Sequence, residues 1–271
     1  MIKNFSLIIS FYAKVKKIDI ELFFRSIRRS SYKPSEIIII FDGPIDQISI
    51  DLINNRINHL ILNYNIITKK FFFDKNIGSA VAYNKAVEIT SNNIVIRCDA
   101  DDFNYRYRFE KIYQKLNNGF SLCGSQMIES FQKKKYLKQL PLTYDQIKKY
   151  IKYRNPFNNP TVGFTKNEFI TLGGYVNIKY KEDYLLWIKW ITKYDNIINL
   201  DEVLVSTQKN SNFISRRNGY INIYSELFIL LFIVKYKLNN FIYAAIIYLI
   251  RVTILLMPYN ILKKLYVRLF R

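Results

Sequence analysis

Three carboxylates stand within four residues of one another, at Asp99, Asp101 and Asp102. At neutral pH they repel one another, and placing them together at the end of a buried strand is costly. A bound Mg²⁺ or Mn²⁺ relieves that cost, because these hard cations take one or two protein carboxylates together with phosphate oxygens. The alternative is a solvated acidic turn or a helix cap, which the apolar segment Ile94–Ile96 just before the cluster disfavours. Taken alone, the cluster therefore fits either an acidic turn or a divalent-metal site that binds phosphate oxygens.

Two further segments have residue types suited to nucleotide binding. Asp42 directly follows an apolar run, where its carboxylate can accept hydrogen bonds from a base or a ribose. It is also the first residue of Asp42-Gly43-Pro44, so a simple turn is an equal alternative. Gly78 stands at a predicted helix start, where the backbone can approach a ligand closely and free N–H groups favour anions. An ordinary helix N-terminus is the alternative there.

The adjacent acids Glu182 and Asp183 precede an apolar, aromatic helix that contains Trp187 and Trp190. A carboxylate in such partly dry surroundings is a candidate general base, because burial raises its pKa towards the working pH. The alternative is that both acids simply cap the helix N-terminus.

Several other chemistries are disfavoured by what the sequence lacks. The single histidine, His59, leaves too few ligands for a zinc site of the usual type and has no evident partner for a catalytic triad. The segment Ser10–Lys14 has no glycine, unlike the phosphate loop of a nucleotidyltransferase. Cys98 and Cys123 lie in apolar runs, so we expect reduced thiols and a cytosolic chain. We also expect no signal peptide, because the N-terminus runs directly into a strand-like segment.

The elements that must position these residues alternate between strand and helix in the first half of the chain. Strands are predicted at Phe5–Phe11, Glu36–Phe41, within Leu60–Phe73 and at Ile94–Cys98, and helices near Ile18–Ile27, Gln47–Asn58 and Ile77–Thr90. This alternation predicts an α/β fold with a doubly wound, mostly parallel sheet, in which ligands bind beyond the carboxyl ends of the strands. Asp42 and Asp99 both lie at such ends, so we expect them to share one site.

The pattern changes after Arg106. We expect a helix at Arg106–Asn117, a strand at Ser121–Ile128, an exposed lysine-rich loop at Gln132–Lys138, a helix at Tyr144–Tyr153, a rigid loop at Asn155–Pro160, a strand at Thr161–Phe164 and a helix at Asp183–Thr192. Lys33-Pro34-Ser35 is expected to break the first helix.

The chain from about Ile221 onward is apolar and helix-forming. Phe241–Met257 is hydrophobic except for Arg251 and Thr253, and it is slightly short for a membrane span. Four basic residues follow, at Lys263, Lys264, Arg268 and Arg271. We favour a pair of amphipathic helices on the membrane surface. The alternatives are a helical hairpin packed on the catalytic domain and a true span.

The 271-residue chain has a formal net charge of +20. This charge can follow from a lysine-rich composition, or it can serve attraction to an anionic membrane surface. Nucleic-acid binding is disfavoured, because the basic residues are scattered and belong to no known nucleic-acid motif.

Taken in order, these segments resemble the family 2 glycosyltransferases, which have the GT-A fold, and in particular the bacterial members that build surface polysaccharides. The resemblance covers about residues 5–220. The matching pieces are Ser6–Tyr12, Asp42-Gly43, Asn76–Asn84, Arg97–Asp102, Arg108-Phe109, Asn155-Pro156, Pro160-Thr161, Gly173-Gly174-Tyr175, Glu182-Asp183-Tyr184 with Trp187, and Arg216-Arg217.

The resemblance implies a role for each matched position. Asp101 would be the principal metal ligand, with Asp99 beside it, and Asp183 the general base. Acceptor or secondary contacts would come from Glu182, Trp187 and Asn159, although Asn159 stands where relatives often have histidine. Donor contacts would come from Ser10, Tyr12, Asp42, Asn76, Gly78, Asn84, Arg97, Asp99, Ala100, Gly173 and Gly174.

We therefore expect a GT-A catalytic domain over residues 1–215, with a nucleotide-binding half at 1–105 and an acceptor half at 106–215, followed by helices at 216–271. The implied reaction is metal-assisted, inverting transfer from a nucleotide-sugar, expected to be a UDP-sugar, to a glycan or lipid-linked glycan. The implied location is cytoplasmic, on the inner face of the membrane. A non-catalytic basic module that binds nucleic acid or membrane, or a nucleotidyltransferase, is the rival.

Overall fold

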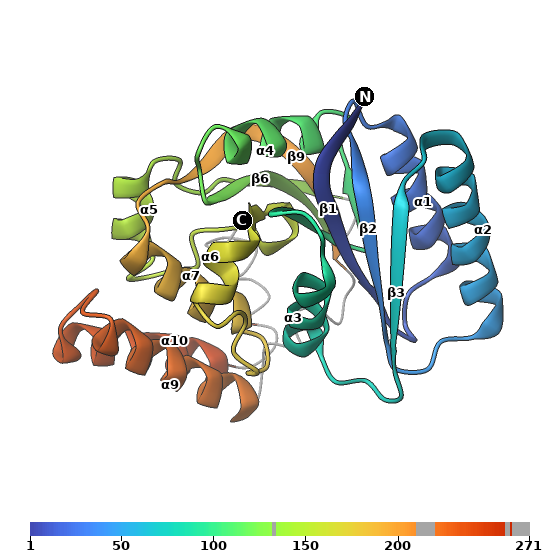
Figure 1. The fold of residues 1–271 in the computed structure, drawn as a ribbon. Helices are drawn as coiled ribbons and strands as arrows, with labels where there is room; N and C mark the ends of the chain where they lie inside the picture. Colours follow the sequence, from blue (N-terminus) through green and yellow to red (C-terminus); the bar gives the residue numbers. More distant parts are fainter. Residues whose placement is uncertain (132–133, 210–219, 258–260, 262–271) are drawn as a thin grey trace.

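A central sheet with helices on both faces organises the molecule (Figure 1), in a computed structural model that describes residues 1–131, 134–209, 220–257 and 261. Nine strands of the described chain form this sheet, in the order β3-β2-β1-β4-β8-β6-β9-β5, with β7 paired to β6. The predicted α/β sheet is therefore present. It is parallel in its first half and mixed in its second.

The first half builds a regular strand–helix alternation. Its elements are β1 (Ile2–Phe11), α1 (Lys17–Arg29), β2 (Lys33–Asp42), α2 (Gln47–Tyr64), β3 (Ile67–Phe73), α3 (Ser79–Ile89) and β4 (Ile94–Asp99). In β2, Ile38 and Ile40 pack into the core beneath α3, whereas Ile37 and Ile39 pack beneath α1 and α2. Consecutive side chains of a strand point to opposite faces, so a run of isoleucines fits a strand that is covered on both sides.

The second half adds antiparallel pairs to the same sheet. Its elements are β5 (Asp102–Asn104), α4 (Arg108–Asn117), β6 (Leu122–Phe131), β7 (Lys134–Lys138), α5 (Tyr144–Tyr150), the 3-10 helix η1 (Asn159–Thr161), β8 (Gly163–Thr165), α6 (Lys166–Thr171), α7 (Glu182–Lys193) and β9 (Ile197–Lys209). Strand β8 lies antiparallel between β4 and β6. One sheet therefore continues across the boundary expected at residue 105.

One expectation about local structure was wrong, that of a loop at Gln132–Lys138, and β2 begins earlier than expected. It begins at Lys33, so the segment Lys33–Ser35, which was expected to break the first helix, follows the end of that helix at Arg29. Lys134–Lys138 is a strand paired with β6, because an edge strand can project lysines into solvent while its backbone completes the ladder. Asp102 begins β5, where it lies opposite Thr207.

The C-terminal helices form a hairpin of α9 (Tyr220–Lys235) and α10 (Phe241–Leu256), which lies beside α7 and away from α1 and α2 (Figure 1). The packed hairpin, one of the alternatives from the sequence, is therefore present. In the part of the chain that the structure describes, no helix is long and apolar enough to cross a membrane. Arg216-Arg217 and the basic residues from Lys263 to Arg271 lie outside the described residues.

Candidate active site

Asp42 ties the end of β2 to the loop before α3. Its carboxylate accepts hydrogen bonds from Asn76 Nδ2 at 2.9 Å, from the Ile77 N–H at 2.7 Å and from the Gly78 N–H at 3.2 Å. Gly43 permits this close approach, because a Cβ there would lie 2.6 Å from the Asn76 nitrogen, and its φ is +88°. Asp42 thus holds the loop before α3 in place, and its contact with a base or ribose stays a prediction.

A buried ion pair lies at the carboxyl end of β4. Arg97 donates to both carboxylate oxygens of Asp99, at 2.8 and 2.7 Å. The guanidinium stands 4.2 Å from the centre of the Tyr83 ring, and the Tyr83 hydroxyl donates to Cys98 O and to Asp99 Oδ1. Burial acts to lower the pKa of Arg97, but Asp99, Tyr83 and Tyr175 together outweigh burial and leave that pKa well above its ordinary value. The site therefore keeps a fixed positive charge beside an ordered carboxylate.

Arg108 fixes the backbone around this pair from within the core. Its fully buried guanidinium donates to Asn104 Oδ1, to Arg97 O at 2.5 Å and to Pro160 O at 2.7 Å. One side chain thereby joins β4, β5 and the start of η1. The turn that carries Asp101 lies between the first two of these elements.

The Glu182-Asp183 pair lies at the N-terminus of α7 and is held from two sides. Asn155 Nδ2 donates to Asp183 Oδ2 at 2.7 Å, and the Tyr184 N–H donates to Asp183 Oδ1 at 2.8 Å. Ser79 Oγ donates to Glu182 Oε1 at 2.5 Å. Burial raises the pKa of both carboxyl groups, and the charge of Asp183 raises that of Glu182 further. A raised carboxyl pKa is what a general base needs near neutral pH.

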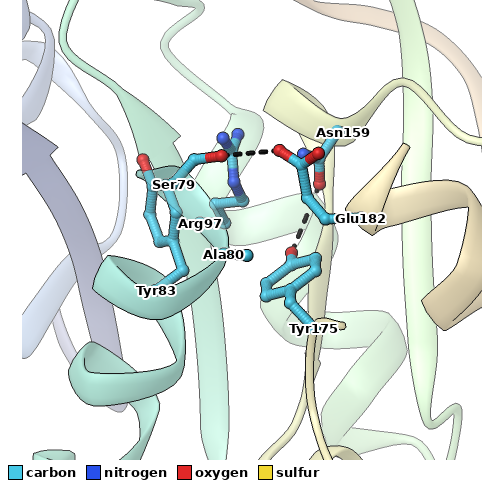
Figure 2. A pocket seen from close by; sticks show the side chains of 7 residues that line it. All are labelled: Ser79, Ala80, Tyr83, Arg97, Asn159, Tyr175 and Glu182. Carbon is cyan, nitrogen blue, oxygen red and sulfur yellow. Dashed lines mark hydrogen bonds between the residues drawn. The ribbon is translucent and has the colours of Figure 1, made fainter. Parts of the chain in front are cut away.

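A small pocket lies between the Arg97–Asp99 ion pair and the N-terminus of α7 (Figure 2). Its lining residues come from α3, β4, η1, the loop before α7 and α7 itself: Ser79, Ala80, Tyr83, Arg97, Asn159, Tyr175 and Glu182. The Ser79–Glu182 hydrogen bond spans it on one side, and the Tyr175 hydroxyl donates to Asn159 Oδ1 at 3.3 Å on another. The structure thus brings Arg97, Asn159 and Glu182 of the predicted set around one space.

Other predicted site residues have structural contacts. The Asn84 amide pairs with the backbone N–H and C=O of Tyr175, both at 2.9 Å, and Gly174 packs directly on Asn84. Gly173 and Gly174 both have positive φ, of +73° and +61°, in the turn that leads to Tyr175. Trp187 is fully buried in the core against Phe157, so the structure does not bring this predicted acceptor residue to the pocket.

The remaining predicted donor residues lie at the sheet edge. Ser10 on β1 lies opposite Asp99 in register, and Ala100 is buried just beyond β4. Tyr12 is 37% exposed immediately after β1. Ligands of parallel sheets bind at this edge, and the contacts of these three residues with a donor stay predictions.

The acidic cluster fits a hard cation that arrives with a diphosphate. Among the described residues, no three or more His, Cys, Asp or Glu side chains gather as a ready metal cage. Asp101 is exposed in the turn after β4, and Asp99 lies one residue before Ala100 with its oxygens ordered by Arg97. One or two carboxylates are all that Mg²⁺ or Mn²⁺ needs when phosphate oxygens complete its shell.

Four polar residues of the site were missed as site residues from the sequence: Ser79, Tyr83, Asn155 and Tyr175. Ser79 and Tyr83 are four residues apart on α3, so they share one face of that helix, and this spacing was available as a signal. Asn155 and Tyr175 stand in segments that resemble the family. Their partners, Asp183 and Asn159, are distant in sequence, so no local pattern indicated these contacts.

Comparisons with known proteins identify the family of the chain. The family model described as Glycosyl transferase family 2 matches residues 6–171. The chain is 32% identical over 265 residues to the amylovoran biosynthesis glycosyltransferase AmsE of Erwinia amylovora, with 97% of each chain covered. It is also 32% identical to the Escherichia coli UDP-Gal:alpha-D-GlcNAc-diphosphoundecaprenol beta-1,3-galactosyltransferase, covering 83% of this chain and 81% of that one. The chain therefore belongs to glycosyltransferase family 2.

Solved structures show the same fold at low identity. Residues 1–349 of Staphylococcus aureus TarS in complex with UDP-GlcNAc match with a TM-score of 0.65 and 16% identity, over 86% of this chain and 67% of that one. The mannosyltransferase PcManGT of Pyrobaculum calidifontis, in complex with GDP-Man and Mn²⁺, matches with a TM-score of 0.61 and 13% identity, over 88% and 65%. The predictions of a GT-A fold and of a glycosyltransferase are confirmed. The relatives' names agree with the expected bacterial surface-polysaccharide type.

Proposed function

We propose that this chain transfers one sugar from a UDP-sugar to a lipid-linked glycan, with inversion at the anomeric carbon, in surface-polysaccharide biosynthesis. The observation that carries the proposal is the Glu182-Asp183 pair, whose carboxyl pKa values are raised. Glu182 lines one pocket together with Arg97, the partner of Asp99. This neighbourhood supports the proposal that the base, directly beside Glu182 in sequence, and the diphosphate-binding end share one site.

The relatives support the choice of substrates. One is named for UDP-Gal and a GlcNAc-diphosphoundecaprenol acceptor, and another for the biosynthesis of amylovoran. The TarS structure that shares the fold holds UDP-GlcNAc. The uridine donor rests on the galactosyltransferase and on TarS, and the lipid diphosphate acceptor rests on the galactosyltransferase alone.

In the proposed reaction, Asp183 takes the proton of an acceptor hydroxyl, and the hydroxyl oxygen forms a bond to the anomeric carbon. The bond from that carbon to the diphosphate breaks in the same displacement, and its electron pair leaves with UDP. When bound, a divalent metal held by Asp101 and Asp99 would supply positive charge to the leaving diphosphate. Asn155 orients the base, because its amide donates to Asp183 Oδ2. Such positive charge meets the main electrostatic demand of the step, which is the negative charge that develops on the leaving diphosphate.

We further propose that the protein acts at the inner face of the cytoplasmic membrane. Along α10, Phe241, Ile242, Tyr243, Ile246, Leu249, Ile250 and Leu256 are all exposed. An apolar helix face on a chain of net charge +20 suits an anionic lipid surface. A lipid-linked acceptor would be presented at that surface.

The test is a transfer assay with a panel of UDP-sugars, Mn²⁺ and GlcNAc-diphospholipid, read by mass spectrometry and by the anomeric NMR coupling of the product. We expect one donor to add one sugar with inversion, and chelation with EDTA to stop the reaction. Retention of configuration would overturn the direct displacement. Steeply salt-dependent binding to nucleic acid, without transfer from any donor, would favour a basic binding module instead.

The change Asp183→Asn should lower kcat by about 10²- to 10⁴-fold, the usual contribution of a general base. The amide keeps its place beside Asn155, so donor binding in a thermal-shift titration should stay close to that of the wild type. Asp51→Asn on α2, at an exposed carboxylate, is the matched control and should be fully active. An active Asp183→Asn enzyme would remove Asp183 from this role.

A further inference from the structure

Arg251 is a charge in the middle of the apolar helix α10, and the proposed transfer reaction gives it no part. Its side chain is only 17% exposed and points back into the protein. Arg251 Nη1 contacts Glu226 Oε2 on α9 at 2.7 Å, and Lys181 Nζ contacts Glu226 Oε1 at 2.6 Å. The Glu226 side chain is 5% exposed. A buried ion cluster of this kind is costly to form, so its contacts outside the hairpin need an explanation.

The contacts of Arg251 converge on the two segments that hold Asp183. Arg251 Nη2 donates to the Tyr184 hydroxyl at 3.1 Å and to Tyr153 O, and the guanidinium lies over the Tyr184 ring. The Tyr184 hydroxyl in turn donates to Ile151 O at 2.6 Å. Tyr184 directly follows Asp183, and the segment through Ile151 and Tyr153 leads to Asn155.

Both flanks of the acid pair are therefore tied to the hairpin. Lys181, just before Glu182, is paired with Glu226, and Tyr184, just after Asp183, is held by Arg251. Ser225 Oγ adds a hydrogen bond to Lys179 O at 2.8 Å. The Asn155–Asp183 hydrogen bond thus joins two segments that one guanidinium from α10 clamps together.

We propose that Arg251, held by Glu226, is a positioning residue for Asp183, so that the C-terminal hairpin is part of the catalytic apparatus. The inference rests on the proposed role of Asp183 as the base. Arginine suits the task because its planar fork serves a carboxylate, a hydroxyl and a carbonyl at once, which a lysine ammonium does not do in the same geometry. A displacement of the base by about 1 Å can cost about 100-fold in rate.

The test compares Arg251→Met, Arg251→Lys and Tyr184→Phe with the wild type in the transfer assay. Lys181 stays paired with Glu226 in all three, so the buried carboxylate keeps a cation. We expect kcat to fall at least tenfold in Arg251→Met, with the KM for the donor within about twofold, and partial recovery in Arg251→Lys. Thr253→Met is the matched control, because Thr253 is exposed on the same helix and bonds only Leu249 O within it.

A second measurement does not depend on activity. Amide hydrogen exchange should be faster at residues 151–155 and 181–185 in Arg251→Met and in Tyr184→Phe, and unchanged in Thr253→Met. If Arg251→Met does not fold, Tyr184→Phe decides, because it keeps the ring and removes only the hydroxyl shared by the three segments. Folded variants with wild-type kcat and wild-type exchange would overturn the positioning role. A wild-type protein that transfers no sugar would contradict the proposed function instead.

Discussion

At the scale of single residues, the site depends on carboxylates whose surroundings differ. Asp99 is neutralised by Arg97 within the pair, whereas Glu182 and Asp183 lie side by side at one helix end. Burial raises the pKa of both α7 acids, and each can thereby hold or release a proton closer to neutral pH. The Arg97–Asp99 ion pair and the Glu182–Asp183 pair of acids thus differ in their electrostatics, as the different tasks proposed for them require.

The raised pKa of Glu182 has a consequence for stability. The folded protein binds this proton more tightly than the unfolded chain, so it holds more protons between the ordinary pKa of 4.5 and the raised value. Stability rises with pH only where the unfolded state holds more protons, so this group makes the free energy of unfolding fall as pH rises through that window. Urea unfolding between about pH 4.5 and pH 7.5 should therefore show a flatter decline in Glu182→Gln than in the wild type.

The exposed Glu88→Gln on α3 is the control for loss of one negative charge alone. Its unfolding free energy should follow the wild-type dependence on pH. Equal slopes for Glu182→Gln and the wild type would contradict the assigned direction.

At the scale of elements, the site is built where loops between strand and helix are held rigidly. Asp42 at the end of β2 binds three donors from the loop before α3, and Gly43 lets the two backbones touch. The Gly174 turn is held similarly, because Lys189 on α7 donates to Gly174 O at 2.7 Å. Functional loops on a rigid scaffold keep their geometry without a ligand.

The substitution Gly43→Ala should be costly in a specific way. The φ of +88° strains any other residue by about 1–3 kcal/mol, and the new Cβ would also collide with the Asn76 backbone. Gly119→Ala is a matched control, because Gly119 has a φ of +94° and nothing within 4 Å of the added Cβ. Urea unfolding should show a larger loss for Gly43→Ala, and only this variant should lose the thermal shift given by a UDP-sugar. Equal losses and equal shifts would contradict this account of the loop.

At the scale of the whole molecule, the two proposed functional surfaces lie at different places. The pocket opens between α3 and α7, and the exposed apolar residues of α10 lie on the hairpin beside α7 (Figure 1). This arrangement would let an enzyme rest on a membrane while its site receives a nucleotide from solution. The helix α2, in contrast, lies on the far side of the sheet from the hairpin.

Binding to anionic vesicles tests the membrane surface. The triple variant Ile242→Glu, Ile246→Glu, Leu249→Glu should lose vesicle binding by more than about tenfold, because each buried apolar side chain contributes about 1.5–3 kcal/mol. The control Ile48→Glu, Ile61→Glu, Leu62→Glu changes three exposed residues of α2 and should bind as the wild type does. Equal binding by both triples would reject α10 as the lipid-facing helix. A dimer that the α10 triple dissociates would identify a second copy as its partner.

The sequence by itself determined the alternation of strands and helices, the acidic residues at the ends of β2 and β4, and the order of motifs that led to the family. These features depend on local patterns: apolar runs, turn residues and carboxylates at fixed spacing. It was right about Asp42 and Asp99 at one edge because parallel strands end together. It missed β9, although this strand is rich in β-branched residues, which are typical of strands.

Only the tertiary structure decided which side chains meet. The bonds from Asn155 to Asp183 and from Ser79 to Glu182 join residues 28 and 103 positions apart, and no local pattern encodes such pairs. The same holds for Arg251, which the sequence presented as an odd charge in an apolar helix and which the fold turns towards Glu226 and Tyr184. The sequence predicted Trp187 as an acceptor contact, but the structure places it in the core, because the face of α7 that carries it packs inward. Packing of distant segments decides contacts, whereas composition and spacing decide only which elements can form.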